Sequence, residues 1–296
     1  MLETVRELYT LLVQFLIKIL ISSFPVVNAL FIMGAGSLGF LLYKRLKPTA
    51  KDIITRSLGL AVLLLGVSEI WECLFVLEDN KLEITGTMLV VFSLLVGLLF
   101  GYALNLDGAF GKLGLLLHRI VLGNSNAKPA DAAKGKKEEL PPELLAAQLL
   151  EKRNCAEGFT MAVVLCGFSS LLITNFLTGR MTDDPVPLLI KLAIDFVCVF
   201  LLASVYGSGV PFAGVVVLIS EGVLGLVYTW WGDILTPEVL DQTALIGAVI
   251  LLLCGITLCT GKKLRPANLI PALFIPVIYT FLMTKIEDSV KEKQDK

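Results

Sequence analysis

Three ionisable side chains lie inside long apolar stretches of this chain, where a membrane-spanning helix would place them far from water. Asp195 lies near the middle of one stretch, Glu221 near the middle of the next, and Lys191 precedes Asp195 by four positions. Residues four apart share one face of a helix, so Lys191 and Asp195 can pair. A charge at bilayer depth is costly, and an acidic residue there indicates a functional site. Together these residues can bind a cation or carry a proton.

A structural role explains the same residues. Lys191 and Asp195 can form a buried ion pair, while Glu221 is protonated and hydrogen-bonded to a neighbouring helix. Asn28, near the outer end of the first span, is a further candidate for the site, although a helix cap or an interhelical hydrogen bond is the commoner use of such a residue.

Only the short turn 207–211 separates the two apolar stretches. Helices joined in this way are expected to be adjacent and antiparallel. At about 1.5 Å per residue, Asp195 and Glu221 then reach a similar depth near the middle of the bilayer. The turn carries no charge, and we expect it to dip into the membrane beside Asp195, as broken helices do at transport sites. Gly207 and Gly209 are therefore added to the candidate binding residues.

The composition is typical of a protein embedded in lipid. Hydrophobic residues make up 56% of the 296 residues and charged residues 17%, against about 25% charged in soluble domains, and the mean hydropathy is +0.81. The net charge of -1 argues against nucleic-acid binding. The six cysteines form no CxxC pair and are expected to be small buried residues, so neither a metal site nor a cofactor is predicted. Because the chain has no GxSxG, HExxH or Walker motif, it is not expected to be an enzyme.

Eight apolar runs have the length that crosses a bilayer as a helix, about 17 to 25 residues. They indicate an all-α polytopic transmembrane helix bundle, because helices satisfy their own backbone in lipid. A weaker segment, Leu8–Phe24, contains Gln14 and Lys18 and is either a ninth span or an interfacial helix. The eight core spans are Val26–Tyr43, Ile53–Val76, Gly86–Leu104, Phe159–Leu177, Val186–Tyr206, Pro211–Trp230, Thr243–Cys259 and Ala267–Met283.

Loop charges indicate the orientation, since short cytoplasmic loops collect Lys and Arg. Basic and acidic loops alternate along the chain as eight crossings require, so the first core span is expected to run from outside to inside. Asn124–Lys137 is typical of a disordered linker. After it, the leucines of Glu143–Arg153 share one face, which predicts an amphipathic helix on the cytoplasmic surface or an ordinary connector.

The chain therefore divides into five expected units. They are 1–24, an N-terminal hydrophobic or interfacial helix; 25–107, a first membrane unit of three spans; 108–156, a cytoplasmic linker with the amphipathic helix; 157–284, a second membrane unit of five spans; and 285–296, a charged tail.

Two helical segments resemble each other. Leu46-Lys47-Pro48 and Leu235-Thr236-Pro237 are each followed by an aspartate four positions after the proline and a glycine eighteen positions after it (Asp52 and Gly66, Asp241 and Gly255). An odd number of crossings separates the two copies, so they are expected to face opposite ways. Inverted repeats are a signature of many secondary transporters. The alternative is chance similarity between two apolar helices.

Several short motifs also occur in a recognisable order. They are Val27-Asn28-Ala29, Lys44-Arg45-Leu46, Ser57-Leu58-Gly59, Ala156-Glu157-Gly158-Phe159, Lys191-Leu192-Ala193-Ile194-Asp195-Phe196, Glu221-Gly222 and Pro266-Ala267-Asn268-Leu269-Ile270-Pro271. This pattern resembles the YqgA-like family, domain of unknown function 554, of bacterial multi-pass inner-membrane proteins. The resemblance implies a multi-pass fold in the bacterial inner (cytoplasmic) membrane and leaves the activity open. That family often has Gln at the position of Glu221, which argues against a mechanism that requires two carboxylates.

The favoured function is a secondary transporter or ion-coupled carrier of a small solute. Asp195 and Glu221 would couple a cation or a proton, with Lys191 as charge partner and with Asp195 expected to matter more than Glu221. The alternative is a non-transporting membrane scaffold or sensor, in which the carboxylates only fix helix packing. The expected partners are the lipid bilayer and a small solute with its cation or proton, and a homo-oligomer is compatible with the sequence. A water-accessible cavity at the carboxylates would favour transport, and a dry, filled centre would favour the scaffold.

Overall fold

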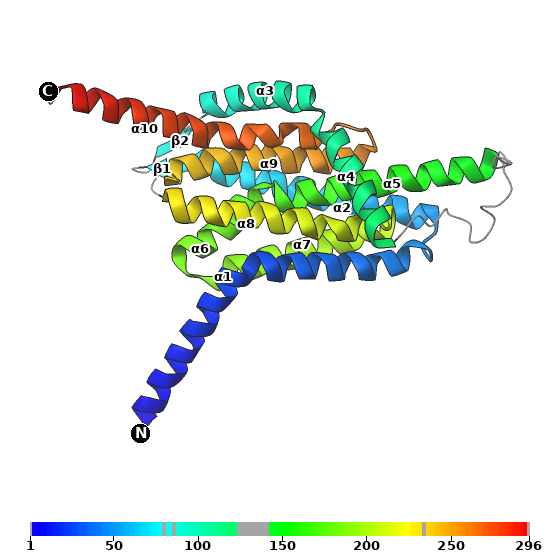
Figure 1. The fold of residues 1–296 in the computed structure, drawn as a ribbon, viewed down its shortest axis with the longest axis horizontal. Helices are drawn as coiled ribbons and strands as arrows, with labels where there is room; N and C mark the ends of the chain where they lie inside the picture. Colours follow the sequence, from blue (N-terminus) through cyan, green and yellow to red (C-terminus); the bar gives the residue numbers. More distant parts are fainter. Residues whose placement is uncertain (1, 79–80, 85–86, 123–141, 233–234, 295–296) are drawn as a thin grey trace.

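The computed structural model describes residues 2–78, 81–84, 87–122, 142–232 and 235–294, and almost all of them are helical. Most helices lie side by side, and the chain passes back and forth between the two ends of a bundle (Figure 1). The strands among the described residues, β1 and β2, form one antiparallel hairpin. The elements are α1 (Leu2–Tyr43), α2 (Pro48–Leu74), β1 (Phe75–Glu78), β2 (Lys81–Ile84), α3 (Thr87–Leu104), α4 (Leu106–Leu122), α5 (Pro142–Gly167), the π-helical segment η1 (Leu172–Leu177), α6 (Thr178–Thr182), α7 (Pro185–Tyr206), the 3-10 turn η2 (Val210–Phe212), α8 (Ala213–Trp231), α9 (Pro237–Thr260), the 3-10 segment η4 (Pro266–Phe274) and α10 (Ile275–Gln294).

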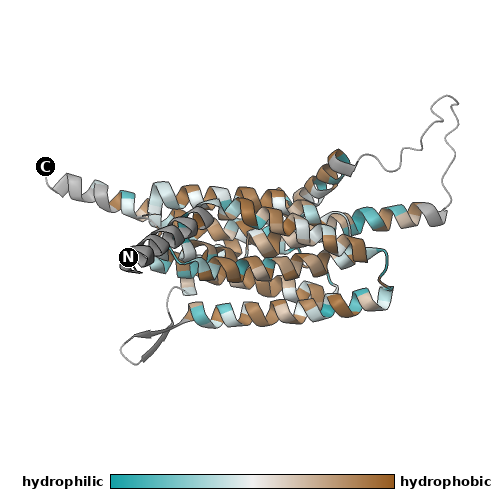
Figure 2. Cartoon of the chain, turned by 90° about the horizontal axis from the view of Figure 1, so that it is seen from below, coloured by the Kyte–Doolittle hydropathy of each residue, from teal (hydrophilic) through white to brown (hydrophobic). Residues whose placement is uncertain are grey.

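The bundle has the dimensions of a membrane protein. Seven helices among the described residues are long and apolar enough to cross a bilayer, and an eighth crossing results if the bent pair formed by α5 with η1 and α6 is one span. The predicted all-α polytopic bundle is therefore confirmed. Figure 2 shows apolar residues along the central lengths of the helices and hydrophilic residues where α5 extends beyond the bundle. On the outer faces, side chains such as Leu60 and Leu99 are 64% and 69% exposed, where a bilayer would cover them.

The first helix differs from the sequence prediction. One helix runs from Leu2 to Tyr43, so Leu8–Phe24 is not a separate helix and the boundary expected at residue 24 falls inside α1. The membrane-spanning part of α1 begins at Ile21, and the segment before it turns away from the bundle (Figure 1). Pro25 lies within the helix, where a proline removes one backbone hydrogen bond but does not end a helix that its neighbours hold in place.

The expected surface helix Glu143–Arg153 is also part of a longer element. It forms the first part of α5, which continues without a break into the bundle, and it projects beyond the other helices (Figure 1). A helix that continues straight into a span does not lie flat on the membrane surface. The connector alternative is therefore closer to the observed arrangement. The predicted linker Asn124–Lys137 lies outside the described residues.

The amphipathic helix at this end of the bundle is α4, which the sequence pattern did not reveal. Its apolar residues Phe110 and Leu113 pack against the main core. The Asp107 amide in its first turn donates to the Asn268 side-chain oxygen at 3.1 Å. Lys263, in the loop before η4, lies 3.8 Å from the Asp107 carboxylate. These contacts fix α4 across the ends of the spanning helices.

Glycines let α2 and α9 pack with their backbones in contact. A Cβ added at Gly66 would lie 2.9 Å from the Leu252 amide nitrogen, and one added at Gly255 would lie 2.7 Å from the Leu63 amide nitrogen. The residue numbers rise along one helix as they fall along the other, so the two helices are antiparallel. Gly66 and Gly255 are the glycines of the two similar sequence segments, and both lie at this contact.

Gly255→Ala is expected to lower the free energy of unfolding by about 1–3 kcal/mol, because the added Cβ would overlap backbone atoms of α2 that cannot move aside independently. Gly34→Ala is the matched control, since no atom lies within 4 Å of a Cβ added there and alanine favours a helix. Thermal melting of the purified proteins in one detergent measures both effects. Equal melting temperatures for the two variants would contradict the close α2–α9 contact.

Candidate functional site

Four polar side chains from three helices meet inside the bundle. Asn28 comes from α1, Lys191 and Asp195 come from α7, and Glu221 comes from α8. Each is at most 1% exposed, so the protein encloses the whole group, which we call the charge cluster. The spacing of four positions places Lys191 and Asp195 on one face of α7, one turn apart.

The Lys191 ammonium is at the centre of the charge cluster. It pairs with Asp195 and lies 3.0 Å from Glu221 Oε1. Asn28 Nδ2 donates to both carboxyl groups, at 2.9 Å to Asp195 Oδ2 and at 2.7 Å to Glu221 Oε1. Both carboxyl groups therefore contact the same ammonium and the same amide, which fixes α1, α7 and α8 relative to one another.

Lys191 also contacts a broken helix. α5 ends at Gly167, and the helix axis bends by 42° before the chain continues as η1. A helix end leaves backbone carbonyl groups without partners inside the helix. Lys191 Nζ donates to one of these, the Cys166 carbonyl oxygen, at 3.0 Å. The ammonium thus joins a fourth spanning element to the charge cluster.

The charge cluster holds one cation and two carboxyl groups away from water. Burial of ions costs free energy, which pairing offsets only if the remaining polar atoms also have partners. Two atoms of the charge cluster, Asn28 Oδ1 and Glu221 Oε2, have no hydrogen-bond partner among the described residues. The hydrogen bonding of the charge cluster is therefore incomplete at these two oxygens.

The structure brings together most of the residues that the sequence singled out. Asn28, Lys191, Asp195 and Glu221 all belong to the charge cluster, and Lys191 pairs with Asp195 as the spacing predicts. The backbones of α7 and α8 share few close contacts, because each helix packs mainly on α1 and α5. The long side chains of Lys191 and Glu221 bridge the space between the two helices.

Gly207 and Gly209 are not brought to the charge cluster, contrary to the prediction. Gly207 ends α7 with φ at 88°, a conformation that glycine adopts without strain, and it lies beside the Tyr43 ring. Gly209 packs against the Cys155 carbonyl of α5. Twelve positions separate Asp195 from Gly207, which is roughly 18 Å along a helix. The turn carries no charge because it is buried against α1 and α5 at the end of the bundle.

Two groups near the charge cluster were not anticipated. The Cys166 carbonyl contributes through the backbone, so no residue type could have indicated it. Arg180 of α6 lies beside Gly225, one turn along α8 from Glu221, and its guanidinium stands 5.7 Å from the Phe176 ring. The Nε atom of Arg180 is buried with no hydrogen-bond partner in the described part of the chain. The loop position of Arg180 in the sequence gave no sign of this.

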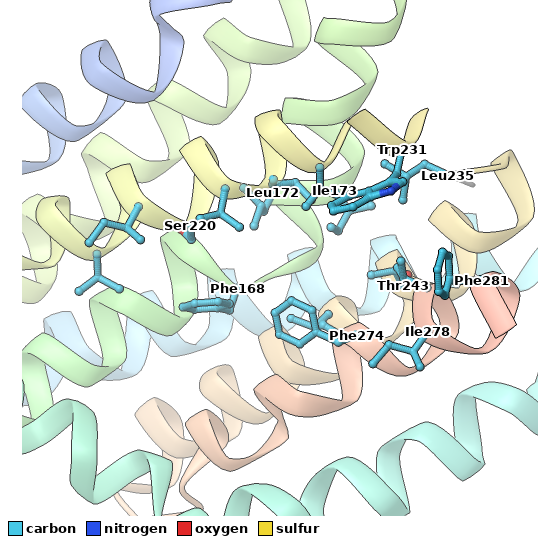
Figure 3. Close-up of a pocket in the computed structure, with 17 residues that line it drawn as sticks. Phe168, Leu172, Ile173, Ser220, Trp231, Leu235, Thr243, Phe274, Ile278 and Phe281 are labelled. Atoms are coloured by element: carbon cyan, nitrogen blue, oxygen red, sulfur yellow. The ribbon is translucent and has the colours of Figure 1, made fainter. Parts of the chain in front are cut away.

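An apolar pocket of about 540 Å³ is shown in Figure 3, and no residue of the charge cluster lines it. Aromatic and aliphatic side chains of η1, α8, η4 and α10 form most of its walls, and Phe168 and Phe274 are among them. Its hydroxyl groups, those of Ser220 and Thr243, donate to carbonyl groups of their own helices. Glu221 follows Ser220 in the chain but does not line the pocket. This lining suits a hydrocarbon chain.

Apolar crossings arranged around an enclosed charge cluster define an integral, multi-pass membrane protein. The chain belongs to the family described as protein of unknown function (DUF554), whose model matches residues 24–281. It is 25% identical over 256 residues to the uncharacterized membrane protein YdfK of Bacillus subtilis, which covers 86% of this chain and 94% of the relative. It is 23% identical over 251 residues to the uncharacterized protein YqgA of Escherichia coli, which covers 85% of this chain and 93% of the relative. No solved structure matches the chain.

Lys191→Met is expected to lower the free energy of unfolding by roughly 3–5 kcal/mol, because it leaves enclosed carboxyl groups without their ammonium partner. Arg56→Met is the matched control. It breaks the ion pair between Arg56 and Asp52, which has the same spacing of four positions. The side chains of Arg56 and Asp52 are 64% and 59% exposed, and exposed pairs contribute about 0.2–1 kcal/mol to the free energy of unfolding. Chemical unfolding in detergent compares the two. Equal losses would contradict the central position of Lys191.

Proposed function

We propose that this protein is a secondary transporter or ion-coupled carrier of a small solute, and that the charge cluster is its coupling site. The observation that carries the proposal is the enclosed charge cluster itself, which joins α1, α7 and α8 to the break after α5. Charged groups inside a membrane are costly and mark ion and substrate pathways. Broken helices carry the binding sites of many transporters.

Reciprocal contacts between α2 and α9 support an inverted repeat of the kind that such carriers contain. The contacting residues are Gly66 with Leu252 and Ala248, and Gly255 with Leu63 and Gly59. Each residue of α2 in this set is separated from its counterpart in α9 by the same number of positions. Exchange of the two helices therefore leaves the contacts unchanged, as a two-fold axis between them would require. We propose that α2 and α9 are equivalent elements of two oppositely oriented repeats.

The two carboxyl groups have different roles in this proposal. Asp195 Oδ2 accepts from Lys191 on its own helix and from Asn28, so it anchors the ammonium. Glu221 comes from a different helix and keeps one oxygen without a partner among the described residues. It is the group that can exchange partners. The sequence favoured Asp195 as the coupling residue, whereas the contacts favour Glu221.

The closed state of the charge cluster supports a second candidate function. Each of its side chains is at most 1% exposed, which is the dry, filled centre expected of a scaffold or sensor whose carboxyl groups only fix helix packing. In a carrier the same conformation is an occluded state. The charge cluster must then become accessible from one side of the membrane when the break after α5 opens. The two functions therefore differ in whether the charge cluster ever becomes accessible to water.

Cys166 can report this opening, because it is enclosed and its thiol lies beside Asp195. In a variant with Cys166 as its sole cysteine, we expect a membrane-impermeant maleimide to label the thiol from at least one side of the membrane. Right-side-out and inside-out vesicles distinguish the two sides, and mass spectrometry measures the labelled fraction. A variant with Cys254 as its sole cysteine is the matched control, since Cys254 is also fully enclosed but lies in α9.

Labelling of Cys166 at least tenfold faster than that of Cys254 is the result that a carrier requires. If both thiols stay unreactive from either side, while the denatured proteins label completely, the charge cluster does not open. The scaffold or sensor function would then be favoured. The experiment does not require the solute to be known.

A further inference from the structure

The two unpartnered oxygens of the charge cluster belong to residues that are already bonded to each other. Asn28 Nδ2 donates to Glu221 Oε1 at 2.7 Å, which leaves Asn28 Oδ1 and Glu221 Oε2 without partners in the described part of the chain. An amide oxygen and an ionised carboxylate oxygen are both acceptors, so neither satisfies the other. A protonated carboxyl group is a donor. One hydrogen on Oε2, if it is directed at Asn28 Oδ1, gives both atoms a partner.

The net charge of the charge cluster also indicates that one of its carboxyl groups is protonated. If both carboxyl groups were ionised, the single ammonium of Lys191 would leave one excess negative charge in a group that is at most 1% exposed. An uncompensated charge in such surroundings is so costly that a carboxyl group takes up a proton instead. One proton brings the charge of Lys191, Asp195 and Glu221 to zero.

The other ionisable groups around Glu221 do not supply the missing positive charge. Cys166 of α5 and Cys198 of α7 are thiols close to Lys191 and Asp195. Arg180 of α6 lies one turn away, beside Gly225, and forms no ion pair with Glu221 within the described residues. A proton therefore remains the simplest source of balance.

Of the two carboxyl groups, Glu221 fits the proton better. Asp195 Oδ2 and Glu221 Oε1 both lie beside the Lys191 ammonium and the Asn28 amide, so these contacts do not separate the two groups. Only Glu221 has a second oxygen, Oε2, that is buried without a partner among the described residues and is therefore free to carry a hydrogen. We infer that Glu221 carries a proton on Oε2 and donates it to Asn28 Oδ1, so that Asn28 and Glu221 together form a proton-binding site. The inference rests on the proposed function only in that this proton would be the coupling ion.

In a carrier cycle, the O–H bond of Glu221 breaks when the charge cluster opens to water, and the proton passes to water. The ionised Glu221 then pairs with Lys191, while Asn28 Oδ1 loses its donor and turns to water. Uptake of a proton from the other side restores the closed charge cluster. One proton is exchanged in each cycle, and no other reactant is needed.

Infrared spectroscopy of the protein in lipid nanodiscs at neutral pH tests the inference. The wild type is expected to show the carbonyl stretch of a protonated carboxylic acid, shifted when H2O is replaced by D2O. Glu221→Gln should remove this band. Asn28→Leu should move it, because the carboxyl group loses its acceptor. Glu69→Gln is the control, since Glu69 of α2 has a buried, unpartnered Oε2 outside the charge cluster, and this variant should keep the band.

Identical spectra for the wild type and Glu221→Gln would overturn the inference, as would loss of the band in Glu69→Gln alone. A metal cation held by the same two oxygens would leave Glu221 ionised and give the first of these results. In that case, the melting temperature of the wild type would rise with sodium or potassium concentration, and that of Glu221→Gln would not.

Thermal melting provides a second measurement that needs no spectral assignment. Glutamine donates from Nε2 to Asn28 Oδ1 as a protonated glutamate would, so Glu221→Gln is expected to melt at or above the wild-type temperature. A clear fall would mean that the wild type holds an ionised Glu221 paired with Lys191, and it would overturn the inference.

The two proposals can fail separately. A protonated Glu221 together with an unreactive Cys166 would retain the proton site and refute the carrier. An ionised Glu221 together with a reactive Cys166 would retain the carrier and refute the proton as its coupling ion.

Discussion

The enclosed ammonium of Lys191 is the interaction on which the rest of the arrangement depends. A cation without water is tolerated only where oxygen atoms surround it, and three different helices supply them. Asp195 lies on the same helix, Glu221 comes from α8, and the Cys166 carbonyl comes from the end of α5. Asn28 of α1 then bridges the two carboxyl groups. Because these groups belong to four spanning elements, the movement of any one of them removes a contact from an ion that cannot be left alone. In the proposed carrier, the charge cluster would therefore open as a unit.

The helices around the charge cluster pack closely enough to exclude water from it. Gly214 lets α8 approach the Ala29 carbonyl of α1, next to Asn28, and Gly66 and Gly255 bring α2 and α9 into backbone contact. Small residues at helix contacts are the usual solution in lipid, where burial of apolar surface gives little advantage to one helix pairing over another. The bend after α5 has the opposite effect, since it interrupts a span at the carbonyl that Lys191 contacts. Tight packing around one interrupted span is the combination that the proposed carrier needs.

The parts of this arrangement that follow local patterns could be predicted from the sequence. Apolar run length indicated the crossings, and the spacing of four positions indicated that Lys191 and Asp195 pair. Contacts between distant segments could be named only as candidates, because a charge in a span signals a site without identifying its partners. The break after α5 has no proline to mark it, and the segment that follows fits against Gly247 of α9. Helix α4 was missed because its glycines resemble a loop, whereas Gly114 faces the Phe159 ring and is required for packing. The absence of charge in the turn 207–211 led to the wrong prediction that it dips into the membrane. Burial of a turn within the protein disfavours charge as much as exposure to lipid does, so the sequence could not separate the two cases.

In the proposed carrier, the charges of the charge cluster serve the function of the protein and not its stability. The melting temperature of the combined variant Lys191→Met, Asp195→Asn, Glu221→Gln tests this claim most directly, because this variant removes all three ionisable groups with little change in side-chain size. Removal of one member of a buried ion network leaves the remaining charge without its partner, whereas removal of all three charges leaves no charge unpaired. The combined variant is therefore predicted to melt at or above the wild-type temperature, well above Lys191→Met alone. A combined variant that melts below Lys191→Met would contradict the account and make the charge cluster a structural element of the bundle.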